Sequence, residues 1–308
     1  MIENNTVFIL GAGAHCSYGF PSGEELKSEI VQLVKKSIRV QGDKNFAHLI
    51  KRGGATFQEI NEERLETFAK ALAIAGQGSI DAFIEANKHQ IGFQKIGKAA
   101  IAQVLLEYER NSTLENNDDD WLSYVFQILI DGVSTPEQFI KNNKISFITF
   151  NYDTYLEFWL CEKIKYSFGI DEKSALDVLN QIQIIHVYGN LGVFPNNDDN
   201  DQYIWIKASQ NIKTIFETLE DDTQIEKAKK LLETAQAICL LGFGFHRENI
   251  ELLDLSHYIG NCALVCSSRY RISQIEWSRL TRPLPQDKIK AAGDSYQCRE
   301  ALRHLPIF

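Results

Sequence analysis

The sequence lacks the excess of basic residues that would favour nucleic acid as a partner. Its formal net charge is -9 at pH 7, from 32 Lys and Arg against 41 Asp and Glu. Two local basic clusters, Lys35–Lys36 and residues 227–230, lie in helix-like stretches and are typical of solvated faces. We therefore expect no direct contact with nucleic acid.

A CxxC cysteine pair is also absent. Structural zinc sites are built from closely spaced Cys and His ligands, and small secreted domains carry denser cysteine patterns than this one. The sequence therefore predicts reduced thiols, no bound zinc and no disulfide framework. The six cysteines are Cys16, Cys161, Cys239, Cys262, Cys266 and Cys298.

Long apolar runs are missing as well. No stretch approaches the roughly 20 apolar residues that a membrane-spanning helix requires. The first residues show no basic segment followed by an apolar run, so the pattern of a signal peptide is not found. We expect no membrane contact and a cytoplasmic location.

Five short apolar runs are present, and they have the composition of buried parallel strands. A turn and a helix-like pattern follow each run, which is typical of a doubly wound, Rossmann-like α/β sheet. In such sheets, ligands bind beyond the carboxyl ends of the strands. The predicted strands are Val7–Leu10, Ile145–Phe150, Ile182–Val187, Ala237–Leu241 and Ala263–Cys266.

The residues after the first predicted strand and helix carry apolar side chains at helical spacing and no convincing strand. We therefore expect one domain over residues 1–308. Its Rossmann-like core would comprise 1–57 and 145–308, and residues 58–144 would form an all-helical insertion.

Two acidic clusters are interpreted as structural. Asp118, Asp119 and Asp120 precede Trp121, where carboxylates cap a helix and favour its positive end. The polar run 195–202 lacks the glycine and the final glutamate of a calcium loop. Neither cluster predicts a metal site.

The stretch VFILGAGAHCSYGFPSG joins the first predicted strand to a predicted helix. Gly11 and Gly13 would let backbone N–H groups approach a pyrophosphate at the positive end of that helix. The stretch is not GxGxxG, because Cys16 stands where the third glycine would be. On this motif alone, a structural turn is favoured.

Polar residues also follow the later predicted strands. Asn151 and Asp153 come directly after the second, although either could instead cap the next helix. His186 closes the third strand before Gly189, and its imidazole is either packed or a general base for water. A second glycine-rich turn, LGFGF, follows the fourth strand and would suit another part of a dinucleotide.

The segments GAGAHCSYGFPSG, NYD, HVYG and LGFGF together resemble the ordered motifs of the sirtuin fold family, over residues 7–268. They are most similar to the sirtuin-like NAD hydrolases of bacterial anti-phage defence. The segments SIDAFIE and GKAAIAQVLLEYE resemble the helical module of those enzymes. The resemblance implies a sirtuin-like fold and an NAD glycohydrolase that releases nicotinamide and ADP-ribose.

The resemblance also implies a role for each matching residue. Asn151 would orient the nicotinamide ribose and water, Asp153 would support that geometry, and His186 would be the base. His15 would contact phosphate, and Pro21 and Gly189 belong to the matching motifs. The pyrophosphate cradle would comprise Gly11, Ala12 and Gly13, and the adenosine side Gly242, Gly244 and Ser267.

Several positions depart from the family pattern. His15 stands where the family usually has serine. Tyr188 occupies the position of the family's HG histidine, and His186 lies two residues earlier. Positions 186 and 188 share one face of a strand, so an imidazole at 186 is expected to enter the same pocket. Protein deacylation is disfavoured, because deacylating sirtuins carry two zinc-binding CxxC pairs.

An NAD hydrolase acting in abortive infection must be held inactive until triggered. The family therefore implies a homo-oligomer, sometimes with a helicase-like ATPase or a phage-derived activator. The alternative is a non-catalytic module that binds NAD or an ADP-ribose-type nucleotide and controls assembly of a defence complex. A redox dehydrogenase is disfavoured, because no acidic ribose-binding residue follows a second strand at the usual spacing.

Overall fold

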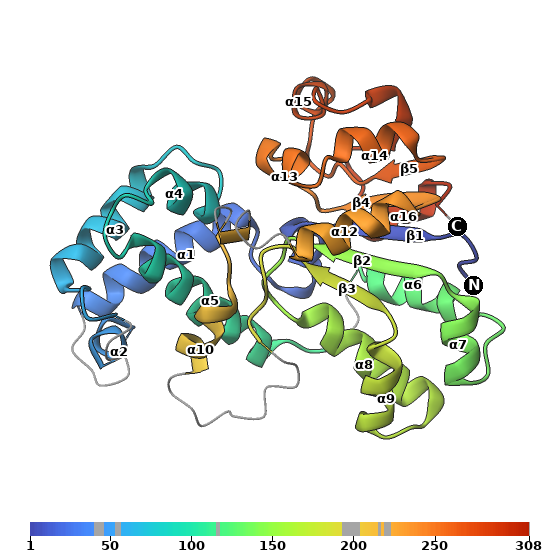
Figure 1. Ribbon diagram of the computed structural model, residues 1–308, viewed down its shortest axis with the longest axis horizontal. Helices are drawn as coiled ribbons and strands as arrows, with labels where there is room; N and C mark the ends of the chain where they lie inside the picture. Colours follow the sequence, from blue (N-terminus) through green and yellow to red (C-terminus); the bar gives the residue numbers. More distant parts are fainter. Residues whose placement is uncertain are drawn as a thin grey trace.

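The computed structural model describes residues 1–39, 46–52, 57–114, 118–192, 204–214, 217–218 and 223–307 (Figure 1). A six-stranded sheet in the order β3-β2-β1-β4-β5-β6 forms its centre, and all neighbouring strands are parallel. The predicted α/β, Rossmann-like fold class is therefore confirmed. The strands are β1 (Thr6–Leu10), β2 (Ile145–Thr149), β3 (Gln183–His186), β4 (Ala237–Leu241), β5 (Leu264–Ser267) and β6 (Ile289–Ala291).

The central strands are apolar because both faces of the sheet are covered. Every residue of β1 and of β4 is buried, as expected for a parallel sheet between helical layers. Leu10 pairs with Thr149 of β2 and with Leu241 of β4. The loops after β1, β2 and β4 therefore all begin at the same edge of the sheet.

All five predicted strands are present, with each end at the predicted residue or one residue away. The sixth strand, β6, was not predicted. It has only three residues, and Lys290 at its centre is exposed. An edge strand this short carries no apolar run, so periodicity gives no signal for it.

A lobe of helices lies beyond the carboxyl ends of the strands (Figure 1). Phe68, Phe83 and Phe93 form its aromatic core, with ring centroids 5.2 to 6.0 Å apart. This helical lobe comprises α1 (Gly23–Arg39), α2 (Phe46–Arg52), α3 (Glu62–Ile74), α4 (Ile80–Ala86), α5 (Phe93–Asn111) and α10 (Ile204–Asn211).

The remaining helices flank the sheet. Trp121 at the start of α6 stacks on Phe8 of β1, with ring centroids 6.3 Å apart. Figure 1 shows α13 and α14 beside β4 and β5, and α8 and α9 beside β3. These helices are α6 (Trp121–Ile130), α7 (Pro136–Asn142), α8 (Tyr155–Phe168), α9 (Glu172–Leu179), α12 (Thr223–Glu233), α13 (Arg247–Leu252), α14 (Leu255–Asn261), α15 (Gln274–Leu280) and α16 (Cys298–His304).

Residues 58–144 contain no strand in their described parts, which leave out 115–117. They nevertheless divide between two places. Helices α3, α4 and α5 join the helical lobe, whereas α6 and α7 pack near the sheet (Figure 1). The lobe is completed by helices from outside this segment, since α1 contacts α3 and α5, and α10 contacts α5.

The acidic cluster before α6 caps two helices. The Asp120 carboxylate accepts a hydrogen bond from the Ser123 N–H at 3.0 Å and thereby caps α6, as predicted. Asp119 instead accepts from the Cys298 and Arg299 N–H groups at 3.1 and 2.6 Å, at the start of α16. The run 195–202 lies outside the described residues.

None of the described helices is long and apolar enough to cross a membrane.

Candidate functional site

The switch point of the sheet lies between β1 and β4. From β1 the chain adds β2 and β3 on one side, and it then returns to add β4, β5 and β6 on the other. In open α/β sheets, this reversal opens a crevice beyond the carboxyl ends of the two strands, and ligands bind there. Both glycine-rich loops of the sequence start at this point.

The two glycine-rich loops pack backbone against backbone. A Cβ built at Gly11 would lie 2.5 Å from the Gly242 oxygen, and one at Gly13 would lie 2.9 Å from the Gly242 Cα. Gly242 has a φ of +55°, and its Cβ would lie 1.9 Å from the Ala14 nitrogen. These three positions therefore admit glycine alone, because a side chain would force the loops apart.

The N–H groups expected to cradle a pyrophosphate are already used between the loops. The Gly11 N–H donates to the Leu241 oxygen and the Gly13 N–H to the Gly242 oxygen, both at 3.1 Å. Gly13 is exposed and Ala12 is partly exposed, so this segment still forms a surface at the crevice. A ligand could therefore approach the backbone of this segment closely, but it would not find the Gly11 and Gly13 N–H groups free.

The helix after the first loop begins with its own acidic cap. The Ser22 N–H donates to the Glu25 carboxylate at 2.8 Å, and the Glu25 N–H donates to the Ser22 hydroxyl at 3.3 Å. The backbone N–H of Ser22 lowers the pKa of Glu25, with a further contribution from the Ser22 side chain. Pro21 is buried just before this cap. A negative charge therefore already occupies the first turn of α1.

His15 and Asp153 form a buried pair across the ends of β1 and β2. The His15 Nδ1 lies 2.7 Å from the Asp153 Oδ1, and the two residues are 1% and 4% exposed. Burial raises the pKa of Asp153, but the His15 charge and hydrogen bond outweigh it, so the pKa lies below its ordinary value. The carboxylate is therefore ionised at neutral pH, and Nδ1–H donates to it.

Two buried nitrogen atoms, one in His15 itself and one in the nearby Asn151, lack a hydrogen-bond partner among the described residues. The His15 Nε2 and the Asn151 Nδ2 have no hydrogen-bond partner within the described part of the chain. Asn151 is 7% exposed and lies two residues after the end of β2. Buried polar atoms are nearly always satisfied, so such orphans indicate water or a ligand.

His186 is bonded at both ring nitrogens. Its Nδ1 lies 2.9 Å from the Asn151 carbonyl oxygen, and its Nε2 lies 2.7 Å from the Glu157 Oε1. A carbonyl can only accept, so Nδ1 carries a proton, and a carboxylate partner favours a second proton on Nε2. Burial lowers the pKa of His186, but the Glu157 carboxylate, together with the Asn151 carbonyl and the Asp153 charge, raises it overall.

Tyr188 has different neighbours from His186. Its hydroxyl donates to the Asn249 Oδ1 of α13 at 2.6 Å, whereas His186 faces Glu157 of α8. The expectation that both side chains share one face does not hold, because β3 ends at His186 and the chain turns there. The Gly189 N–H closes that turn on the His186 oxygen at 3.3 Å.

A second tyrosine links the sheet edge to the helical lobe. The Tyr152 hydroxyl donates to the Asp81 carboxylate at the start of α4. Burial raises the pKa of both groups, and the Tyr152 hydrogen bond partly offsets this for Asp81. Tyr152 and Tyr188 therefore connect the loops after β2 and β3 to α4 and α13.

The other predicted site residues have structural contacts. Gly189 has a φ of +71°, and its Cβ would lie 2.0 Å from the Asn211 oxygen. Gly244 is exposed beside the His246 imidazole. The hydroxyl of Ser267, which is fully buried, donates to the Ser268 oxygen at 2.8 Å. Ser268, which was not predicted, accepts from the Gly242 N–H at 3.0 Å and holds the second loop.

A carboxyl group from the helical lobe also reaches the loop after β2. The Glu109 Oε1 accepts from the N–H and the hydroxyl of Thr154, at 2.6 and 2.9 Å. Burial is the main reason that the pKa of Glu109 rises to about 7, and the nearby Asp153 charge adds to it. Glu109 therefore changes its protonation state near neutral pH.

Sequence reasoning missed Glu157, Glu109, Asp81 and Asn249. Glu157 gave the strongest signal, because it lies in the otherwise apolar start of α8, four residues after Asp153. The other three come from helices far away in the sequence. Their spacing within those helices gives no indication that they reach the sheet edge.

A cleft of about 630 Å³ opens beside β3. His186, Glu157 and Gly189 line it together with amides such as Asn190 and Asn211. His186 and Gly189 thus face this outer cleft, whereas His15, Asp153 and the glycine loops cluster around the ends of β1, β2 and β4.

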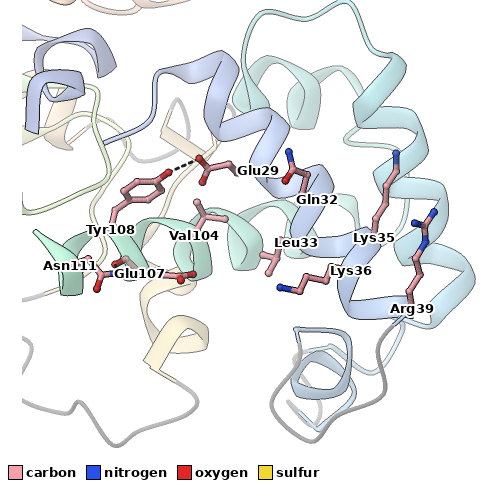
Figure 2. Close-up of a pocket in the computed structure, with 10 residues that line it drawn as sticks. All are labelled: Glu29, Gln32, Leu33, Lys35, Lys36, Arg39, Val104, Glu107, Tyr108 and Asn111. Carbon is pink, nitrogen blue, oxygen red and sulfur yellow. Dashed lines mark hydrogen bonds between the residues drawn. The ribbon is translucent and has the colours of Figure 1, made fainter. Parts of the chain in front are cut away.

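A larger groove of about 890 Å³ lies between α1 and α5 of the helical lobe. Figure 2 shows Lys36 and Arg39 toward one end, and Glu29 hydrogen-bonded to Tyr108 at the other. This groove contains none of the predicted site residues.

No group of three or more His, Cys, Asp or Glu side chains within the described ranges is arranged to hold a metal ion. All six cysteines, which fall within those ranges, are free thiols. No protein-family model matches the chain, and no curated protein sequence matches it.

Proposed function

We propose that this protein is an NAD glycohydrolase of the sirtuin-like type found in anti-phage defence. The observation that carries the proposal is the pair of buried nitrogens, His15 Nε2 and Asn151 Nδ2, without a partner among the described residues. They belong to the loops after β1 and β2, next to the switch point of a Rossmann-like sheet. A nucleotide with a hydroxyl-rich ribose supplies the hydrogen-bonding atoms that such a site needs.

In the proposed reaction, the bond between C1′ of the ribose and the nicotinamide nitrogen breaks. Its electron pair leaves with neutral nicotinamide, water adds to C1′, and one proton is released. The Asn151 amide orients the ribose and the water, and Asp153 supports that geometry through His15. The loop formed by Gly11, Ala12 and Gly13 receives the pyrophosphate. On the adenosine side, Gly244 faces the nucleotide while Gly242 and Ser267 shape the loop.

His186 enters the proposal with a changed role. Both of its ring nitrogens already have partners, so its hydrogen bond to the Asn151 carbonyl makes it a positioning residue. To act as the base, His186 would first have to break its hydrogen bond to Glu157 or to the Asn151 carbonyl. Pro21 and Gly189 act through the backbone of their loops.

We also propose that the enzyme acts in the cytoplasm as an effector of abortive infection and is inactive until triggered. A homo-oligomer, a helicase-like ATPase or a phage-derived activator would control it. Exposed apolar side chains support assembly, since Ile74 and Ile91 of the helical lobe are 74% and 64% exposed. Direct binding to nucleic acid is not part of the proposal.

A second candidate is a non-catalytic module that binds NAD or an ADP-ribose-type nucleotide and controls assembly. The observation favouring it is Tyr188 at the position of the family's histidine, where its hydroxyl is bonded to Asn249. Burial raises the pKa of Tyr188 far above neutrality, so this phenol is not a base.

Nicotinamide release from NAD by the purified full-length chain distinguishes the two candidates. The hydrolase predicts release by the wild type and its loss in Asn151→Ala. The matched control is Asn261→Ala, because the Asn261 amide bonds only within α14, to His257. NAD binding without release by the wild type would favour the binding module. Equal release by wild type and Asn151→Ala would overturn the assigned site.

A further inference from the structure

We infer that His15, oriented by Asp153, accepts the proton of the attacking water. This inference rests on the proposed NAD hydrolysis and assigns its base. The sequence resemblance gave His15 a phosphate contact and made His186 the base. In the present assignment His15 is the base, and His186 remains a positioning residue.

The imidazole rings of His15 and His186 differ in their hydrogen bonds. With Nδ1–H donated to the Asp153 carboxylate, Nε2 is the ring nitrogen of His15 that remains to accept a proton. That atom is buried and meets no partner in the described structure. His186 has a carbonyl on one nitrogen and a carboxylate on the other, so both of its ring nitrogens have partners. Of these two histidines, His15 is the one with a ring nitrogen that has no partner among the described residues.

Aromatic side chains surround the His15 imidazole. Its ring lies among Tyr18, Phe20 and Tyr155, with centroids 5.9 to 6.3 Å away. These rings fix the imidazole and exclude bulk water. An imidazole held in one tautomer by a buried carboxylate is the usual arrangement of a general base.

His15 and Asp153 also lie at the same edge of the sheet as Asn151. His15 and Asp153 follow the adjacent strands β1 and β2, whose carboxyl ends are in register. Asn151, which the proposed function places on the ribose, lies two residues from Asp153. The candidate base and the ribose-orienting amide thus come from one edge of the sheet.

The proposed step balances without another reactant. Water forms a bond to C1′ as the bond from C1′ to nicotinamide breaks, and the electron pair stays on nicotinamide. The water proton passes to His15 Nε2, and Asp153 stabilises the imidazolium that results. The proton then returns to solvent, which restores the neutral ring.

The test compares the pH dependence of kcat for nicotinamide release in the wild type and in four variants. His15→Asn keeps a donor toward Asp153 and removes Nε2. Asp153→Asn lets its amide donate to Nδ1, which places the imidazole proton on Nε2. His186→Gln tests the alternative base, and His257→Gln, at an exposed position of α14, is the control.

Several titratable groups face this region and must be separated from His15. Asp153 and Tyr155 belong to the loop and helix after β2, Glu109 to α5, and His186 to β3, while Tyr18 bonds Asp120 before α6. Because Glu109 has a pKa of about 7, the profile is also measured in Glu109→Gln.

If His15 is the base, kcat should fall about 10²–10⁴-fold in His15→Asn and in Asp153→Asn. The affinity for NAD should stay within about threefold of wild type. The fall of kcat toward low pH should persist in His186→Gln and Glu109→Gln and disappear in His15→Asn. His257→Gln should match the wild type.

If the wild type is active and the kcat of His15→Asn lies within threefold of it, the assignment is overturned while the proposed hydrolysis stands. The assignment would also be overturned if kcat no longer fell toward low pH in His186→Gln. Absence of nicotinamide release by the wild type would instead overturn the proposed function itself. If His15→Asn does not fold, as judged by circular dichroism, Asp153→Asn decides.

Discussion

Replacing Gly242 by alanine should destabilise the protein far more than the same replacement at Gly19. Both glycines have positive φ, +55° and +86°, and both lie outside α-helices. A left-handed conformation costs an alanine about 1 kcal/mol, and Gly19→Ala should lose roughly that amount. No atom of the described chain lies within 4 Å of a Cβ at Gly19, so no steric cost is added.

At Gly242 a clash is added to the backbone cost. The new Cβ would lie 1.9 Å from the Ala14 nitrogen and 2.2 Å from the Gly13 carbonyl carbon. Relieving that contact means separating two backbones by more than 1 Å, which breaks the Gly13 hydrogen bond to the Gly242 oxygen. We therefore expect Gly242→Ala to cost at least about 4 kcal/mol, among the largest effects of single substitutions.

Urea denaturation followed by far-ultraviolet circular dichroism measures both effects. The predicted difference in unfolding free energy between Gly242→Ala and Gly19→Ala is about 3 kcal/mol or more. A difference below about 1 kcal/mol would refute the reasoning, because it would mean that the two loops are not in backbone contact.

Two further predictions concern groups near the site and a distant cap. Folding favours protonated Glu109, so stability falls as pH rises from 4.5 through about 7, by up to about 3 kcal/mol. Glu109→Gln should therefore be more stable than wild type at pH 8 and similar to it at pH 5, as measured by urea denaturation; the same gain at both pH values would contradict this. Asp119→Ala should cost about 2 kcal/mol in thermal unfolding, because two N–H groups of α16 lose their acceptor, whereas exposed Asp118→Ala should cost little; equal losses would exclude the capping role.

Much of the fold could be predicted from the sequence because it depends on local patterns. Five of the strands are apolar runs of four to six residues, and such runs indicate a buried parallel sheet without tertiary information. Asp120 was likewise predicted as a cap from its place before an apolar helix. β6 could not be predicted in this way, since pairing with β5 rather than composition makes it a strand.

The site was predictable as a set of loops but not as a set of contacts. Parallel strands bring Gly11, Asn151, His186 and Gly242 to one edge, and that follows from the fold class alone. Which side chains face one another depends on where each strand ends. β3 ends at His186, and the turn there directs its imidazole toward Glu157. No pattern in the sequence predicts at which residue this strand ends.

The most direct test of the central claim is amide hydrogen exchange with and without an NAD analogue. A carbocyclic analogue suits this test, because it lacks the ring oxygen that stabilises the positive charge developing at C1′ as neutral nicotinamide leaves, and so it stays intact. At saturation the account predicts protection of residues 11–23, 150–155 and 242–247, with no change in α7 or α14. Protection confined to the cleft at 189–192 and 210–213, or saturable binding that leaves the switch-point loops unprotected, would contradict it.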